Sequence, residues 1–111
     1  MDFDALKQHR EQRFFRVWDG FVAAEHVSAS EEAVRRLIDG VLAIGPVLDE
    51  RTARRLVRQS VLRFNELNDG WICTIEREDI CEELDRIIEL CGFSCDDEDW
   101  LAGRDGDDIF A

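Results

Sequence analysis

Apolar residues recur every three to four positions along most of this 111-residue chain, and glycine or proline interrupts the pattern at intervals. This spacing places apolar side chains on one face of an α-helix, whereas a half-buried strand would need strict alternation. Four stretches have it: residues 4–25, 28–44, 49–67 and 76–91. The sequence therefore predicts an all-α fold, a single-domain bundle of four main helices.

Capping residues mark where the middle two helices should begin and end. Ser28 and Glu31 have the S-x-x-E spacing of a capping box, which predicts a helix start at that point. Gly45 and Pro46 should end this helix, and Asp49 suits the N-cap of the next one. Because only a few residues separate the two helices, we expect them to form an antiparallel hairpin.

The C-terminal part of the chain contains one ambiguous segment and one further helix signal. Residues 71–75 alternate like a strand but are too few to decide between strand, loop and helix. Gly92 and Phe93 fit a Schellman motif after residues 76–91, and Ser94 is placed to cap a short fifth helix through Leu101. We expect residues 1–103 to form the helical domain and residues 104–111 an acidic, loosely ordered tail.

The apolar faces of these helices define an expected core. Its members are Phe14, Trp18, Phe21, Leu37, Ile38, Val41, Leu56, Val57, Val61, Phe64, Leu84 and Ile88. The stretch 4–25 has the widest apolar arc, about half of the helix circumference. A helix of that kind is central in the bundle or buries one flank against another chain.

Charge is distributed very unevenly. The chain has a formal net charge of −12. Residues 1–63 hold 11 basic and 10 acidic side chains, whereas residues 64–111 hold 3 and 16. A phosphate backbone is bound mainly by lysine and arginine, so the sequence disfavours a nucleic-acid or anionic-membrane partner. It favours a basic protein partner.

Two stripes of opposite charge are expected on helix faces that point away from the core. The acidic stripe consists of Glu78, Glu82, Asp85 and Glu89, which fall within an arc of about 60° around a helix. The arginine stripe consists of Arg51, Arg55, Arg58 and Leu62. Each stripe is typical of the solvated face of an amphipathic helix. Alternatively, a second copy or another protein brings an arginine stripe to an acidic one.

A second acidic group precedes the C-terminal end. It consists of Asp96, Asp97, Glu98 and Asp99, followed by Trp100. Acids early in a helix complement its dipole, and Trp100 either anchors the tail to the core or is an exposed hot spot. A calcium loop needs acids at alternate positions, a glycine at the sixth and a glutamate at the twelfth. Residues 105–108 do not meet that register.

No residue pattern in the sequence indicates a catalytic or metal centre. Only Cys91 and Cys95 approach the spacing of a zinc pair, and no second close pair exists, so the four cysteines are expected as core thiols. His9 and His26 have no accompanying nucleophile and are expected at the surface. Glycine-rich phosphate loops and H-E-x-x-H motifs are also absent. We therefore expect no cofactor.

The start of the chain bears on its compartment. Residues 1–4 are acidic and lack the apolar region of a signal peptide. No stretch approaches the roughly 20 apolar residues of a membrane span. A cytoplasmic location with reduced thiols is expected. The 13 arginines against one lysine hint at a bacterial source.

These features predict a non-catalytic protein-binding domain rather than an enzyme. We expect an acidic inhibitor or immunity-type protein that covers a basic partner such as a nuclease. The acidic stripe, residues 96–99 and Trp100 would form the contact. The alternative is a helical homodimer with a structural or scaffolding role, held together by the arginine stripe. A third possibility is an enzyme in which acids such as Glu78 and Glu82 act on a substrate.

Overall fold

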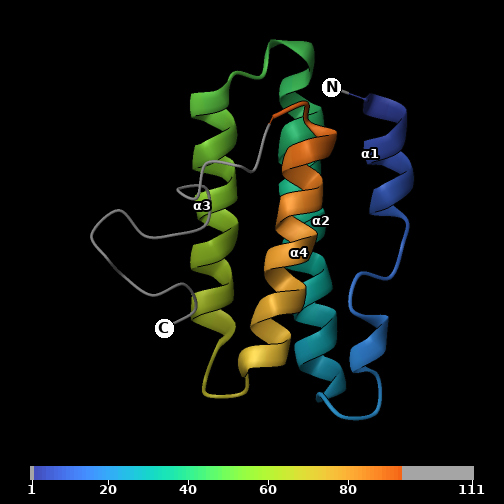
Figure 1. Cartoon of the computed structure of the whole chain (residues 1–111), viewed down its shortest axis with the longest axis vertical. Helices are drawn as coiled ribbons and strands as arrows, with labels where there is room; N and C mark the ends of the chain where they lie inside the picture. Colours follow the sequence, from blue (N-terminus) through green and yellow to red (C-terminus); the bar gives the residue numbers. More distant parts are fainter. Residues whose placement is uncertain (1, 94–111) are drawn as a thin grey trace.

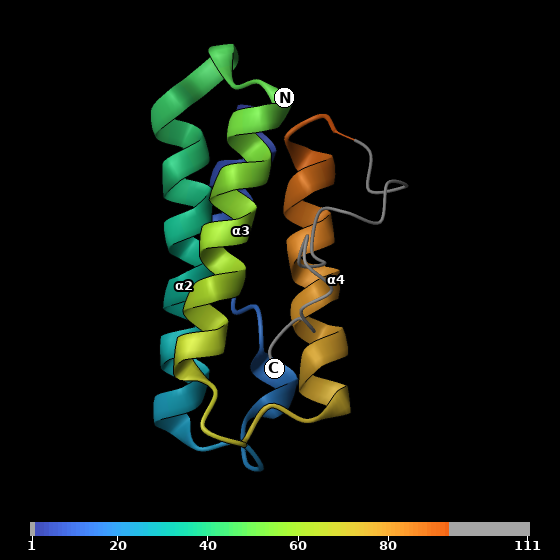
Figure 2. The same ribbon diagram turned by 90° about the vertical axis from the view of Figure 1, so that its left-hand side faces the viewer.

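The computed structural model describes residues 2–93, and this part of the chain consists of helices joined by loops, without a β-strand. The α-helices are α1 (Phe3–Arg10), α2 (Ala24–Ile44), α3 (Glu50–Leu67) and α4 (Thr74–Leu90), and the 3₁₀ helices are η1 (Arg16–Trp18) and η2 (Gly45–Val47). Figures 1 and 2 show α2, α3 and α4 running alongside one another, with α1 on the side opposite α3. The all-α prediction is confirmed, whereas the predicted fifth helix and acidic tail lie outside the described residues.

The turn between α2 and α3 forms where the sequence predicts it. Gly45 adopts a φ of +77°, which residues with a Cβ rarely adopt, and Pro46 follows it. Asp49 then accepts a hydrogen bond of 2.8 Å from the Thr52 N–H, and hydrogen bonding from Thr52 lowers the pKa of the Asp49 carboxyl. Asp49 therefore caps α3, and the predicted hairpin is confirmed.

The connection between α3 and α4 resolves the ambiguous segment. The side-chain oxygen of Asn68 accepts hydrogen bonds from the N–H groups of Gly70 and Ile72, at 3.0 and 3.2 Å. The segment between Gly70 and Cys73 is a loop, and α4 begins at Thr74. Of the three alternatives left open for residues 71–75, the loop applies to residues 71–73 and the helix to residues 74–75, and Asn68 satisfies two of the loop's backbone donors.

The end of α4 is the predicted Schellman motif. Gly92 adopts a φ of +92° and its N–H donates to the Glu89 carbonyl at 2.9 Å. The N–H of Phe93 donates to the Ile88 carbonyl at 3.2 Å. These two bonds satisfy carbonyls that a helix end otherwise leaves without a donor.

The predicted single helix over residues 4–25 is wrong. Helix α1 ends at Arg10, and the chain turns through residues 11–15 before η1. The cause is the buried Glu31 carboxylate of α2, which accepts a hydrogen bond of 3.1 Å from the Phe14 N–H. A further interruption is Gly20, whose φ of +97° does not occur in a helix. Contacts with the rest of the fold therefore override the local periodicity.

The predicted capping box is also wrong. Helix α2 begins at Ala24, so Ser28 lies inside the helix instead of at its start. Glu31 does not reach back to a cap; its carboxylate is bound by the Arg13 side chain, with Nε at 3.0 and 2.7 Å from its two oxygens. The short S-x-x-E pattern did not distinguish a capping glutamate from one that holds a loop.

The core was largely predicted, with its main error in the N-terminal segment. Nine of the twelve expected residues are buried: Trp18, Leu37, Ile38, Val41, Val57, Val61, Phe64, Leu84 and Ile88. Phe14 and Leu56 are half-buried, and Phe21 is 63% exposed. Phe21 is exposed because it lies in the loop after η1, whereas the prediction placed it on a helix face. Phe15 is buried and stacks on Trp18 with centroids 4.1 Å apart.

None of the helices in residues 2–93 combines the length and apolar character that crossing a bilayer requires.

Candidate protein-binding site

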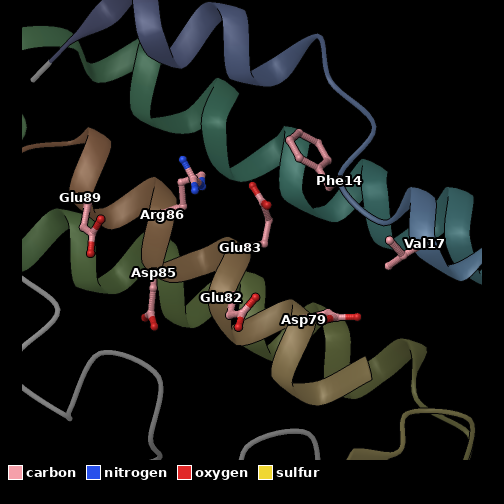
Figure 3. A pocket seen from close by; sticks show the side chains of 8 residues that line it. All are labelled: Phe14, Val17, Asp79, Glu82, Glu83, Asp85, Arg86 and Glu89. Atoms are coloured by element: carbon pink, nitrogen blue, oxygen red, sulfur yellow. The ribbon is translucent and has the colours of Figure 1, made fainter. Parts of the chain in front are cut away.

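An acidic groove of about 570 Å³ runs along α4 beside the N-terminal segment (Figure 3). Its lining consists of Phe14, Val17, Asp79, Glu82, Glu83, Asp85, Arg86 and Glu89. Five carboxylates against one guanidinium give this groove a strongly negative surface. Its walls are therefore suited to cationic groups.

Helical spacing explains why α4 presents these charges. Ile80, Leu84 and Ile88 are 1% exposed or less and face the core. The charged side chains occupy the remaining arc of the helix. Figure 3 shows Glu82 and Glu89 projecting from α4 away from α1, and Glu83 pointing towards the side on which Phe14 lies.

Two of the five carboxylates hold the fold together. Glu83 bonds the Nε2 atom of His9, and the two side chains are only 13% and 10% exposed. Asp79 accepts a hydrogen bond of 2.8 Å from the Trp18 indole N–H. These bonds fasten α1 and η1 to α4, so Asp79 and Glu83 join the N-terminal segment to the helix that carries the groove.

The histidine prediction is corrected by these contacts. His9 is 8% exposed and therefore buried, because α4 covers it. His26 is half-buried and stacks on the Trp71 ring, with centroids 4.6 Å apart and planes 8° apart. Both histidines contact residues more than 40 positions away, and no local sequence signal could have revealed those partners.

The predicted acidic stripe is largely part of this groove. Glu82, Asp85 and Glu89 line it, and Glu78 lies beside it on the same helix. Glu78, Glu82 and Glu89 are exposed, whereas Asp85 is half-buried. The remaining predicted contact residues, Asp96, Asp97, Glu98, Asp99 and Trp100, lie outside the described residues. Five lining residues were not predicted as part of the site: Phe14, Val17, Asp79, Glu83 and Arg86.

The arginine stripe lies on the outer face of α3. Arg51, Arg55 and Arg58 are exposed, and Leu62 is 46% exposed. Within residues 2–93, these three arginines form no ion pair. A smaller depression of about 230 Å³ between α2 and α3 is also basic, because Arg36 and Arg63 line it. The outer face of α3 is thus positively charged, whereas that of α4 is negatively charged.

The described cysteines do not form a metal or nucleophile site. Burial raises the pKa of the Cys91 thiol to about 11, and it also raises the pKa of Cys81. Cys73 is exposed at the start of α4, so the expectation of a core thiol is wrong at this position, and Cys95 lies outside the described residues. Across residues 2–93, no three His, Cys, Asp or Glu side chains come together in a way that could hold a metal ion.

Comparison with known proteins finds no match among family models, curated proteins or solved structures. The charge, exposure and contacts of the groove residues are therefore the basis for assigning a function.

Proposed function

We propose that this protein is a non-catalytic binding protein that covers a basic surface of another protein, in the manner of an inhibitor or immunity protein of a nuclease. The observation that carries this proposal is the acidic groove. Its exposed carboxylates, Glu82 and Glu89, continue onto Glu78 outside the lining. Solvent-exposed acids along one helix face are the complement of a lysine- or arginine-rich surface.

Exposure favours binding over catalysis at this surface. Catalytic carboxylates are usually enclosed in surroundings that tune their protonation. Glu78 and Glu82 are exposed, and the more enclosed Asp79 and Glu83 are bonded to Trp18 and His9. The enclosed acids are therefore occupied in holding the fold, and the open ones are available to a partner.

Three exposed apolar side chains, which we call the apolar patch, add a second element of recognition near the Trp18–Asp79 hydrogen bond. They are Val17, Phe21 and Ile75, which are 72%, 63% and 64% exposed. Val17 lines the groove, Phe21 bonds the backbone of Trp18, and Ile75 lies one turn before Asp79 on α4. Interfaces commonly combine a charged rim with an apolar contact of this kind.

Long-range electrostatics support the same function. The net charge of −12 attracts a cationic protein before contact, and such steering raises association rates. A basic enzyme that must be inhibited quickly is the kind of partner that benefits most from this effect. We infer that association is fast and strongly dependent on ionic strength.

The test begins with affinity capture from the source cells, followed by binding kinetics with the captured protein. The triple variant Glu78→Gln, Glu82→Gln, Glu89→Gln should associate about tenfold more slowly at low salt. The difference should vanish near 1 M salt, where the screening length is about 3 Å.

A matched control removes the same charge elsewhere. Glu25, Glu32 and Glu66 are exposed carboxylates on α2 and α3. Their joint replacement by Gln should leave the on-rate within about twofold of that of the unchanged chain. The reason is that salt screens the electric field of charges distant from the binding surface. An acidic partner, or an on-rate indifferent to salt and to the α4 variant, would contradict the proposed function.

A further inference from the structure

The charges of α3 and α4 match in spacing as well as in sign. The arginine stripe occupies positions 51, 55, 58 and 62, and the acidic stripe occupies positions 78, 82, 85 and 89. Both stripes have intervals of four, three and four residues. When the two helices are aligned in opposite directions, Arg51 falls opposite Glu89 and Arg58 falls opposite Glu82.

The facing residues of the two stripes lie at similar distances from the short connection between the helices. Helix α3 ends at Leu67, α4 begins at Thr74, and the two run in opposite directions (Figures 1 and 2). Arg51 lies 16 residues before Leu67, and Glu89 lies 15 residues after Thr74. At about 1.5 Å per residue, Arg51 is as far from the end of α3 as Glu89 is from the start of α4 to within about one residue, and the same holds for Arg58 and Glu82.

Arg51 and Arg58 are not paired with Glu82 or Glu89 within one molecule. Among residues 2–93, no ion pair joins Arg51 or Arg58 to α4. Both stripes lie on the sides of their helices away from the core, where Arg51, Arg58, Glu82 and Glu89 are exposed. Figures 1 and 2 show α3 and α4 side by side, so the positive stripe lies on one helix and the negative stripe on the adjoining one, and we call the two stripes together the α3–α4 surface.

We propose that this surface binds the same surface of a second copy, about a twofold axis parallel to the helices. Such an axis keeps every residue at its own level and places α3 of each copy antiparallel across α4 of the other. Arg51 and Arg58 of one copy then face Glu89 and Glu82 of the other, and the twofold axis repeats both pairs. Leu62 lies at the end of each contact, next to Glu78 of the other copy.

The size of this surface sets the strength of the dimer. Helices of 18 and 17 residues are about 26 Å long and about 10 Å wide each, which gives about 1,000 Å² buried in total. That area is at the lower limit for a specific interface, and exposed ion pairs each contribute little. The dimer therefore forms at high micromolar concentration and dissociates as salt is raised.

Dimerisation goes beyond the proposed function and also bears on it. The dimer covers Glu82 and Glu89, which the basic partner needs in the proposed complex. A second copy and the partner therefore compete for α4. The dimer does not depend on the existence of such a partner, because its contacts come from this chain alone.

Charge reversal tests the pairing. In low salt, sedimentation of the full chain should give a mass approaching twice 12.9 kDa. Two double variants are compared: Arg51→Glu with Arg58→Glu, and Glu82→Arg with Glu89→Arg. Each should be monomeric, because the stripes of α3 and α4 then carry charge of the same sign. An equimolar mixture of the two variants should regain the dimer as a heterodimer, which also shows that both variants fold.

A control variant, Arg16→Glu, Arg36→Glu, makes the same charge change on η1 and α2 and should dimerise like the unchanged chain. Three outcomes would each overturn the proposal. The first is an unchanged chain that stays monomeric at high micromolar concentration in low salt. The second is a reversed variant that still dimerises alone. The third is a mixture that stays monomeric although both variants keep the helical circular dichroism of the parent. If a basic partner binds α4 and the chain forms no dimer, the proposed function stands and the dimer proposal fails.

Discussion

The indole N–H of Trp18 donates a hydrogen bond of 2.8 Å to a carboxylate oxygen of Asp79 on α4. Trp18 is fully buried, and its ring also packs edge-on against Trp71 with centroids 5.9 Å apart. Asp79 lines the acidic groove at the same time. A single carboxylate therefore joins the core to the binding surface, and the shape of the groove depends on how η1 is held.

Removal of the Asp79 carboxylate should destabilise the fold. In Asp79→Ala the buried indole N–H of Trp18 loses its acceptor, which typically costs about 1–3 kcal/mol. Asp79→Asn keeps a side-chain oxygen in the same place and should cost less. Urea unfolding followed by tryptophan fluorescence measures both. Equal losses for the two variants would show that the hydrogen bond is not what stabilises this contact.

The core position of Leu84 gives a second stability prediction. Leu84 is 0% exposed on α4, so Leu84→Ala should lower the free energy of unfolding by about 2–5 kcal/mol. Leu62→Ala removes the same atoms from a side chain that is 46% exposed and should change it by less than about 1 kcal/mol at low protein concentration. Thermal and denaturant unfolding by circular dichroism compares the two. Similar losses would contradict the assignment of Leu84 to the core.

The helices that were predicted well are those whose signals are local. Asp49 caps α3 through Thr52 three residues away, and Gly92 closes α4 through Glu89. Each signal involves residues within one helical turn, so the sequence contains all of it. The charged face of α4 was predictable for the same reason, since helical period alone separates Glu82 from the buried Leu84.

The N-terminal segment was mispredicted because distant residues determine it. Glu31 lies 17 residues from Phe14 and holds its backbone N–H, while Glu83 lies 74 residues from His9 and holds its ring. Neither partner can be found from apolar periodicity. The α4 side of the groove could therefore be predicted from the sequence. The side formed by the N-terminal segment became visible only in the three-dimensional structure.

The cysteines give a prediction on reactivity and pH. Cys73 is exposed and should react with a thiol reagent in the native protein, whereas the buried Cys91 should react only after unfolding. Burial raises the pKa of Cys91 to about 11 from its ordinary 9.0. The raised pKa stabilises the fold below pH 9, and this contribution is lost as pH rises towards 11.

Mass spectrometry of the labelled protein identifies which thiols react at each pH. Cys91→Ala removes the titrating group, so its free energy of unfolding should fall less between pH 9 and 11 than that of the parent. Rapid labelling of Cys91 in the native protein at pH 7 would contradict its burial.

The last prediction concerns the apolar patch and separates its role from that of the charges. Phe21 is 63% exposed, so Phe21→Ser should leave the fold intact and act mainly on a bound complex. If the basic partner covers Phe21, the variant should dissociate about tenfold faster, because apolar contacts act on the off-rate. Salt should not change this ratio, since the lost contact is uncharged. Val47→Ser is the control, an 80% exposed residue in η2 outside the groove lining. If both substitutions raise the off-rate equally, or neither changes it, the apolar patch is not part of the interface. Binding would then rest on the carboxylates of α4.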